Sequence, residues 1–68
     1  MRYNTVKSFN ASGKIMNEEH FRHVNDAYKA FCEWCEIAEK LPKGYETTIA
    51  RYDDSGYLMN LHTVTGMG

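Results

Sequence analysis

The chain has 68 residues and a mass of 7.9 kDa, which is enough for one small domain over 1–68. Its 8 basic and 9 acidic side chains leave a net charge of -1, which argues against a general binder of polyanions. The sequence has no apolar run long enough to span a membrane, and its first residues lack the apolar core of a signal peptide. We therefore expect a cytoplasmic protein.

The N-terminal segment predicts a β-hairpin, with strands over 4–8 and 14–16 around a glycine-containing turn. Segments 9–15 and 52–58 share one order: aromatic, Asn or Asp, any residue, Ser, Gly, any residue, aliphatic. Because we find no repeat in the flanking residues, we interpret this similarity as shared turn chemistry, not as a duplication. The first hairpin is the weaker of the two, and without it the element order is β-α-β-β.

A long amphipathic helix is predicted from Asn17 to about Leu41. Asn17 is a good N-cap, and two glutamates follow in the first turn, where the helix dipole favours acids. Pro42 and Gly44 then end the helix. At about 100° per residue, the apolar face comprises Phe21, Val24, Ala27, Tyr28, Phe31, Trp34, Cys35 and Ala38.

The C-terminal segment predicts a second hairpin, with strands over 45–52 and 57–64 and a type I turn completed by Gly56. Pairing Asp53 with Tyr57 across this turn places the remaining residues in register. Ile49 is then opposite Leu61, and Arg51 is opposite Met59. One face of the hairpin holds Tyr45, Thr47, Ile49, Tyr57, Met59 and Leu61. The other face holds Glu46, Thr48, Ala50, Tyr52, Leu58, Asn60 and His62.

Together these elements predict an α+β fold of order β-β-α-β-β, with one antiparallel sheet and the helix packed on one face. Five Tyr, three Phe and one Trp are many rings for so small a core, so some should stay exposed and mark a partner-binding surface. We expect Tyr52, beside Leu58 and His62, to be exposed on the outer face of the sheet.

Cys32 and Cys35 form a C-x-x-C motif well inside the predicted helix. Redox motifs of this kind open a helix, where the dipole lowers the thiol pKa, whereas here Glu33, Glu36 and Glu39 would raise it. We therefore expect these cysteines to pack. A redox-active or metal-linked dimer is the alternative.

Metal, cofactor and catalytic sites are not expected. His20 and His23 form an H-x-x-H pair, but about 13 Å of helix would separate His23 from Cys32, too far for one zinc ion. The sequence contains no Gly-rich phosphate loop, no G-x-S-x-G elbow and no H-E-x-x-H motif. We therefore expect a binding protein and not an enzyme.

Two surfaces are candidates for binding a partner protein. The first is the acidic outer face of the helix, with Asp26, Glu33 and Glu36; the second is the sheet face with Tyr52, Leu58 and His62. An alternative function is single-strand nucleic-acid binding, with the rings stacking on bases and the basic first seventeen residues contacting phosphates. Six acidic residues against three basic ones on the helix argue against it.

In size, in its lack of catalytic motifs, and in its order of hairpin, acidic helix and hairpin, the chain resembles small phage-encoded inhibitors of host machinery. Anti-CRISPR proteins and inhibitors of host RNA polymerase are such proteins. The resemblance implies a stoichiometric inhibitor without cofactor. The acidic helix face or the rings of the sheet face lead us to expect docking on a host protein with a basic groove, such as a nucleic-acid-binding enzyme. A homodimer is a further expectation.

Overall fold

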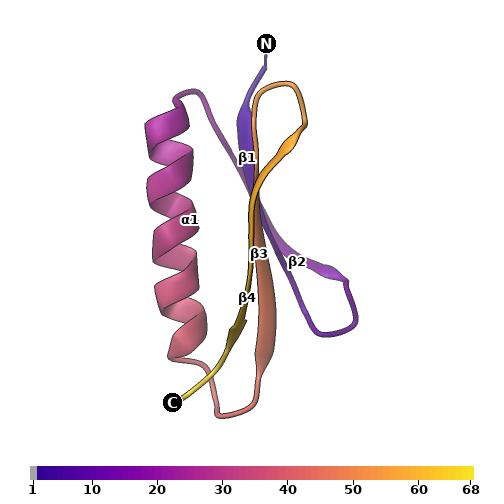
Figure 1. Cartoon of the computed structure of the whole chain (residues 1–68), viewed down its shortest axis with the longest axis vertical. Helices are drawn as coiled ribbons and strands as arrows, with labels where there is room; N and C mark the ends of the chain where they lie inside the picture. Colours follow the sequence, from indigo (N-terminus) through magenta and orange to yellow (C-terminus); the bar gives the residue numbers. More distant parts are fainter. Residues whose placement is uncertain (1) are drawn as a thin grey trace.

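A computed structural model describes residues 2–68 as four strands and one helix. Their bounds are β1 (Asn4–Phe9), β2 (Ile15–Phe21), α1 (Val24–Glu39), β3 (Glu46–Tyr52) and β4 (Leu58–Thr65). The strands form one antiparallel sheet of order β2-β1-β3-β4, and α1 crosses one face of it (Figure 1). The predicted α+β class and β-β-α-β-β order are confirmed. No described element covers the other face of the sheet, which we call the outer face.

The two hairpin turns have the same structure. In each, the backbone N–H of Asn10 or Asp53 donates to the carbonyl oxygen four residues later, at 2.9 Å. The Oδ1 atom of the same residue accepts hydrogen bonds from the backbone N–H groups two and four residues later. Gly13 and Gly56 have φ angles of 83° and 89°, which glycine adopts at little cost. Both predicted turns are therefore confirmed.

The similarity of the hairpins extends past the turns. Each second strand contains a β-bulge, whose extra residue is Met16 in β2 and Met59 in β4, and an asparagine follows both methionines. Our interpretation that the flanking residues do not repeat was therefore wrong. Lys7 and Ala50 occupy equivalent positions in the two hairpins, and they also lie opposite each other in the β1–β3 pair. A pseudo-twofold axis consequently passes through the sheet between these two residues.

The bulge in β4 changes the predicted register of the second hairpin. Tyr52 lies opposite Leu58, as the turn requires, but the extra residue shifts every later pair by one. Ile49 is therefore opposite His62 and not Leu61, and Arg51 is opposite Asn60 instead of Met59. His62 lies on the helix-facing side of the sheet, so its predicted place beside Tyr52 was wrong. Leu61 moves to the outer face, where it is 59% exposed.

The helix begins at Val24, seven residues after the predicted N-cap. Residues 15–21 instead pair with β1, and His23 occupies the N-cap position in an extended conformation. Cross-strand pairing therefore outweighs the local helix signals at Asn17. The H-x-x-H pair is divided between β2 and the helix N-cap, so it forms no helical motif.

Small residues dominate the core between α1 and the sheet. Ala27, Ala30, Phe31 and Ala38 face the sheet, which contributes Val6, Ile49 and Val64. Alanine lets the helix approach the strands closely, so larger side chains lie at the helix edges. Val24 and Tyr28, predicted to be buried, are exposed for this reason. Tyr45 and Tyr57, expected on the inner face of the sheet, are exposed because Tyr45 precedes β3 and Tyr57 belongs to the turn before β4.

Residues 66–68 make backbone hydrogen bonds at the C-terminal end of α1 and to the segment that follows it. The backbone N–H of Met67 donates to the Glu39 carbonyl at 2.9 Å, and that of Gly68 to the Leu41 carbonyl at 3.0 Å. These bonds satisfy carbonyl groups at the helix C-terminus. Gly66 is buried, and its N–H donates to the Tyr45 carbonyl at 2.7 Å.

Candidate partner-binding surface

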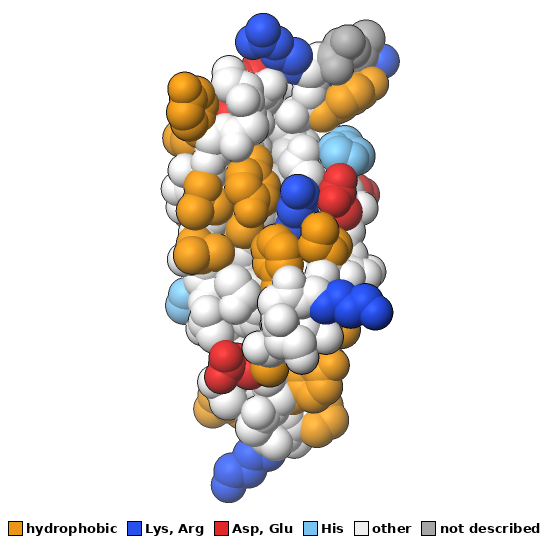
Figure 2. Space-filling view, turned by 90° about the vertical axis from the view of Figure 1, so that its right-hand side faces the viewer, with side chains coloured by type: hydrophobic (Ala, Val, Ile, Leu, Met, Phe, Trp, Pro, Cys, Tyr) orange, Lys and Arg blue, Asp and Glu red, His pale blue; other side chains and the backbone are white. Residues whose placement is uncertain are grey.

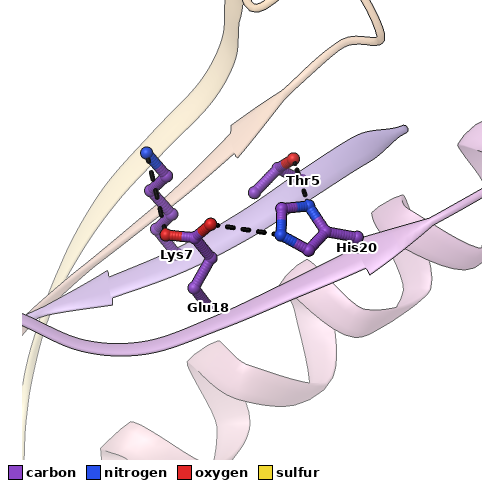
Figure 3. A network of polar contacts seen from close by, with 4 residues as sticks. All are labelled: Thr5, Lys7, Glu18 and His20. Carbon is purple, nitrogen blue, oxygen red and sulfur yellow. Dashed lines mark hydrogen bonds and ion pairs between the residues drawn. The ribbon is translucent and has the colours of Figure 1, made fainter. Parts of the chain in front are cut away.

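The outer face of β1 and β2 carries a connected group of polar side chains (Figure 3). The Glu18 carboxylate lies 3.9 Å from Lys7 Nζ and 3.2 Å from His20 Nε2. A hydrogen bond of 3.1 Å joins His20 Nδ1 to Thr5 Oγ1. Lys7 Nζ also lies 5.1 Å from the centre of the Tyr52 ring. Glu18 thus contacts Lys7 across the two strands and His20 along its own strand.

Thr5, His20 and Glu18 form a hydroxyl–imidazole–carboxylate series, the order that hydrolases use. The second hairpin shows what this arrangement does. At the equivalent positions, Thr48 and Thr63 make the same cross-strand hydrogen bond, with their hydroxyl oxygens 3.0 Å apart. We therefore assign the Thr5–His20 contact to strand pairing, which both hairpins need.

The equivalent positions on β3 and β4 are otherwise apolar. Where the first hairpin has Lys7 and Glu18, the second has Ala50 and Leu61. Leu61 lies next to Tyr52 and to Leu58, which is 50% exposed. Figure 2 looks onto this face and shows hydrophobic side chains gathered beside a few charged ones. We define the outer patch as Tyr52, Leu58 and Leu61, with Ala50 beneath them.

Part of the outer patch recurs on the other side of the pseudo-twofold axis. Phe9 and Ile15 stand in the first hairpin where Tyr52 and Leu58 stand in the second. Ile15 is 48% exposed, close to the value for its counterpart. Apolar side chains therefore lie on both halves of the outer face, with the larger group on β3 and β4.

The predicted sheet surface is present in a changed form. Tyr52 and Leu58 are brought together as cross-strand neighbours, whereas His62 lies on the opposite side of the sheet. Tyr52, predicted to be exposed, is half-buried, with Lys7 over its ring. Leu61 takes the place of His62 and was missed by the sequence prediction. The repeated Met-Asn after both turns was the signal that could have revealed the bulge and hence the position of Leu61.

The acidic helix face is a separate surface. Asp26, Glu33 and Glu36 are all exposed, and none forms an ion pair with another residue in 2–68. Asp26 and Glu33 border a shallow hollow that also includes Phe21, so this part of the face lies beside the edge strand β2. The helix itself lies on the opposite side of the sheet from the outer face (Figure 1). Its carboxylates are free to attract a basic partner.

The two cysteines are both free thiols. Cys35 is half-buried and packs against the core, as predicted, whereas Cys32, which was also expected to pack, is exposed. Burial raises the pKa of the Cys35 thiol, and the neighbouring Cys32 and Glu39 raise it further. A raised pKa is the opposite of what activates a thiol. Within residues 2–68, no three His, Cys, Asp or Glu side chains are grouped to hold a metal ion.

Comparisons of the chain with protein-family models, curated proteins and solved structures found no match. The helix described here is too short and too polar to cross a membrane. The function must therefore be inferred from the surfaces of this chain alone.

Proposed function

We propose that the protein is a small non-catalytic protein-binding module whose partner docks on the outer patch. The observation that carries this proposal is the exposure of Leu58 and Leu61, at 50% and 59%, beside the half-buried Tyr52. They lie on a sheet face that no described element covers. Contiguous apolar side chains on a small domain are typical of protein contact surfaces, because covering them removes apolar area from water.

The surroundings of the outer patch favour a partner with basic side chains. Asp53 and Asp54, in the turn between β3 and β4, border a shallow hollow that also includes Tyr52 and Lys7. The charge of Lys7 is paired with Glu18, so the two aspartates supply the unpaired charge of this hollow among the described residues. The partner that fits has an apolar centre and basic residues next to it. A nucleic-acid-binding enzyme of a host cell meets this description, which agrees with an inhibitor of the kind that phages encode.

Charge-neutral truncation of the patch tests this proposal. Tyr52→Ala combined with Leu58→Ala should weaken capture of a defined protein from host lysate, whereas Glu33→Lys combined with Glu36→Lys should retain it. A photo-crosslinking residue at position 61 should label the same protein, and one at position 36 should not. The reverse pattern would assign binding to the acidic helix face and overturn the proposal. Circular dichroism shows whether each variant is folded.

Two further measurements distinguish a partner protein from a second copy of the chain and from nucleic acid as the occupant of the outer patch. Sedimentation that shows a dimer lost on Leu61→Lys would assign the outer patch to a second copy of the chain, against the proposal. Saturable, salt-sensitive binding of a labelled single-stranded oligonucleotide, lost in Tyr52→Ala, would assign it to nucleic acid instead. A monomer that binds no oligonucleotide agrees with a protein partner.

A further inference from the structure

The helix-facing side of the sheet contains a pocket of about 390 Å³, within the range of small-ligand sites. It lies between the C-terminal half of α1 and β2, where the first hairpin diverges from the helix (Figure 1). Its lining includes Ser8, Met16, Asn17, Glu19, Trp34 and Ile37.

The pseudo-twofold axis relates this pocket to a site that the protein fills itself. The counterpart of Ser8 is Arg51, which is only 8% exposed and lies between the sheet and α1. Arg51 Nε donates a hydrogen bond of 2.7 Å to Asn60 Oδ1. The guanidinium carbon lies 5.5 Å from the centre of the Tyr28 ring of α1. Thus one half of the sheet holds a guanidinium group where the other half has a space.

The pocket retains the groups that surround a guanidinium in the filled site. Asn17 lies opposite Ser8 just as Asn60 lies opposite Arg51, and it borders the pocket. Trp34 supplies an aromatic ring from α1, as Tyr28 does at the other end. What the pocket lacks is the long cationic side chain, because Ser8 is short.

The charges and polar groups of the pocket also favour a cation. Its lining includes two glutamates and no basic residue. Glu18 is paired with Lys7 and His20, whereas Glu19 forms no ion pair within residues 2–68. Thr47 borders the pocket too, and its buried Oγ1 has no hydrogen-bond partner among the described residues. A buried hydroxyl without a partner is uncommon in a complete structure.

We propose that this pocket binds an alkylguanidinium group, carried by an arginine side chain of a peptide or by a free small molecule. The guanidinium lies against Trp34 and donates to Asn17, with Glu19 supplying the opposite charge. The alkyl stem packs against Met16 and Ile37. The pocket and the outer patch are on opposite sides of the sheet, so this proposal is independent of the proposed function.

Trp34 is the single tryptophan of the chain, so its fluorescence reports directly on the pocket. The probes are butylguanidinium and its neutral isostere butylurea, together with a capped tripeptide holding arginine between two alanines and the same peptide with citrulline. Both guanidinium probes should give a saturable change, and both neutral probes should bind about tenfold more weakly or not at all. Tighter binding of the arginine peptide than of butylguanidinium assigns the group to a protein, and equal binding assigns it to a small molecule.

Three variants test the named contacts. Ser8→Arg should place a guanidinium beside Asn17, fill the pocket and abolish binding. Asn17→Ala should weaken butylguanidinium binding about tenfold. Glu19→Gln should weaken it about threefold, while the matched charge change Glu36→Gln, on the exposed helix face, should leave it unchanged.

Several outcomes would overturn the proposal. These are no saturable binding of either guanidinium probe, equal binding of the urea, or equal losses in Glu19→Gln and Glu36→Gln. Unchanged binding by a folded Ser8→Arg would also overturn it. If Ser8→Arg does not fold, the Asn17→Ala and Glu19→Gln measurements decide, because both positions are exposed on the edge strand β2.

Discussion

The guanidinium of Arg51 lies against the ring of Tyr28, 5.5 Å from its centre, and so joins β3 to the first half of α1. Its Nη1 atom is buried and has no hydrogen-bond partner among the described residues, and no carboxylate pairs with it there. Asn60 Oδ1, at 2.7 Å from Nε, is the one side-chain acceptor of this guanidinium within residues 2–68. Removing Asn60 and removing Arg51 should therefore change the free energy of unfolding by different amounts.

Asn60→Ala should lower the free energy of unfolding by about 1–3 kcal/mol, because it leaves a buried charged donor without its acceptor. Arg51→Met should be neutral or stabilising, because it keeps the buried stem and removes a charge that no carboxylate compensates. Urea denaturation of both variants measures the difference. A larger loss in Arg51→Met than in Asn60→Ala would show that the guanidinium is itself the stabilising group.

Gly13→Ala and Gly56→Ala should each destabilise the protein by about 1 kcal/mol. A Cβ at either position would meet no atom within 4 Å, so the cost comes only from the positive φ. Because the two turns share one structure, the two losses should agree in urea titrations. A difference of more than about 2 kcal/mol between them would contradict the equivalence of the hairpins.

Gly66→Ala should cost more, about 2–3 kcal/mol, for a steric reason. A Cβ at Gly66 would collide with the backbone carbonyl oxygens of Leu41 and Pro42. The tail would have to move away from the helix end. Thermal unfolding, with the exposed neighbour Thr65→Ala as the control, measures this cost. Equal melting temperatures for the two variants would show that the tail is not needed for stability.

Cys35 should make the protein less stable at alkaline pH. Its thiol pKa is raised in the folded state by burial and by Cys32 and Glu39. As the pH rises, the thiol therefore ionises first in the unfolded state. The contribution of Cys35 to the free energy of unfolding is full below the ordinary thiol pKa, about 8.5, and is lost as the pH rises through the higher pKa of the folded state.

The difference between the wild type and Cys35→Ala isolates this contribution from other groups that titrate at high pH. Urea midpoints from about pH 7 to about pH 10 should fall more steeply in the wild type. Cys32→Ala, which leaves the half-buried thiol in place, should still show an alkaline loss greater than that of Cys35→Ala. Parallel curves for the wild type and Cys35→Ala would contradict the prediction.

Lys7→Ala combined with Glu18→Leu gives the first hairpin, at these two positions, the residues that the second hairpin has at the equivalent ones. The exposed ion pair contributes little, so the free energy of unfolding should change by no more than about 1 kcal/mol. Circular dichroism should show the same fold, and urea denaturation measures the change. A much larger loss would mean that the group formed by Thr5, Lys7, Glu18 and His20 is required for the fold.

Local signals predicted much of the fold correctly. Asn10 and Asp53 mark their turns because the turn chemistry involves only residues within four positions, and Pro42 with Gly44 marks the end of the helix. The helix start was wrong because the preference of Asn17 for an N-cap is weak compared with pairing across the β1–β2 hairpin.

The candidate surface could be predicted only near the turn. Tyr52 and Leu58 are adjacent to the turn residues, so their pairing follows from it. Leu61 lies beyond the bulge, and one extra residue moves every later side chain to the other face. The pocket was beyond prediction, because it depends on which of two equivalent positions, Ser8 or Arg51, has a side chain long enough to reach α1.

The two methionine bulges also affect how copies of the protein can meet. β2 and β4 are the edge strands of the sheet, and an edge strand offers unpaired backbone groups on which a foreign strand can grow. Met16 and Met59 interrupt the regular pairing of these strands close to the turns, and bulges twist an edge away from a flat template. The bulges therefore disfavour the addition of a foreign strand at the turn-proximal part of both edges, while leaving the apolar side chains of the outer face free to make contacts.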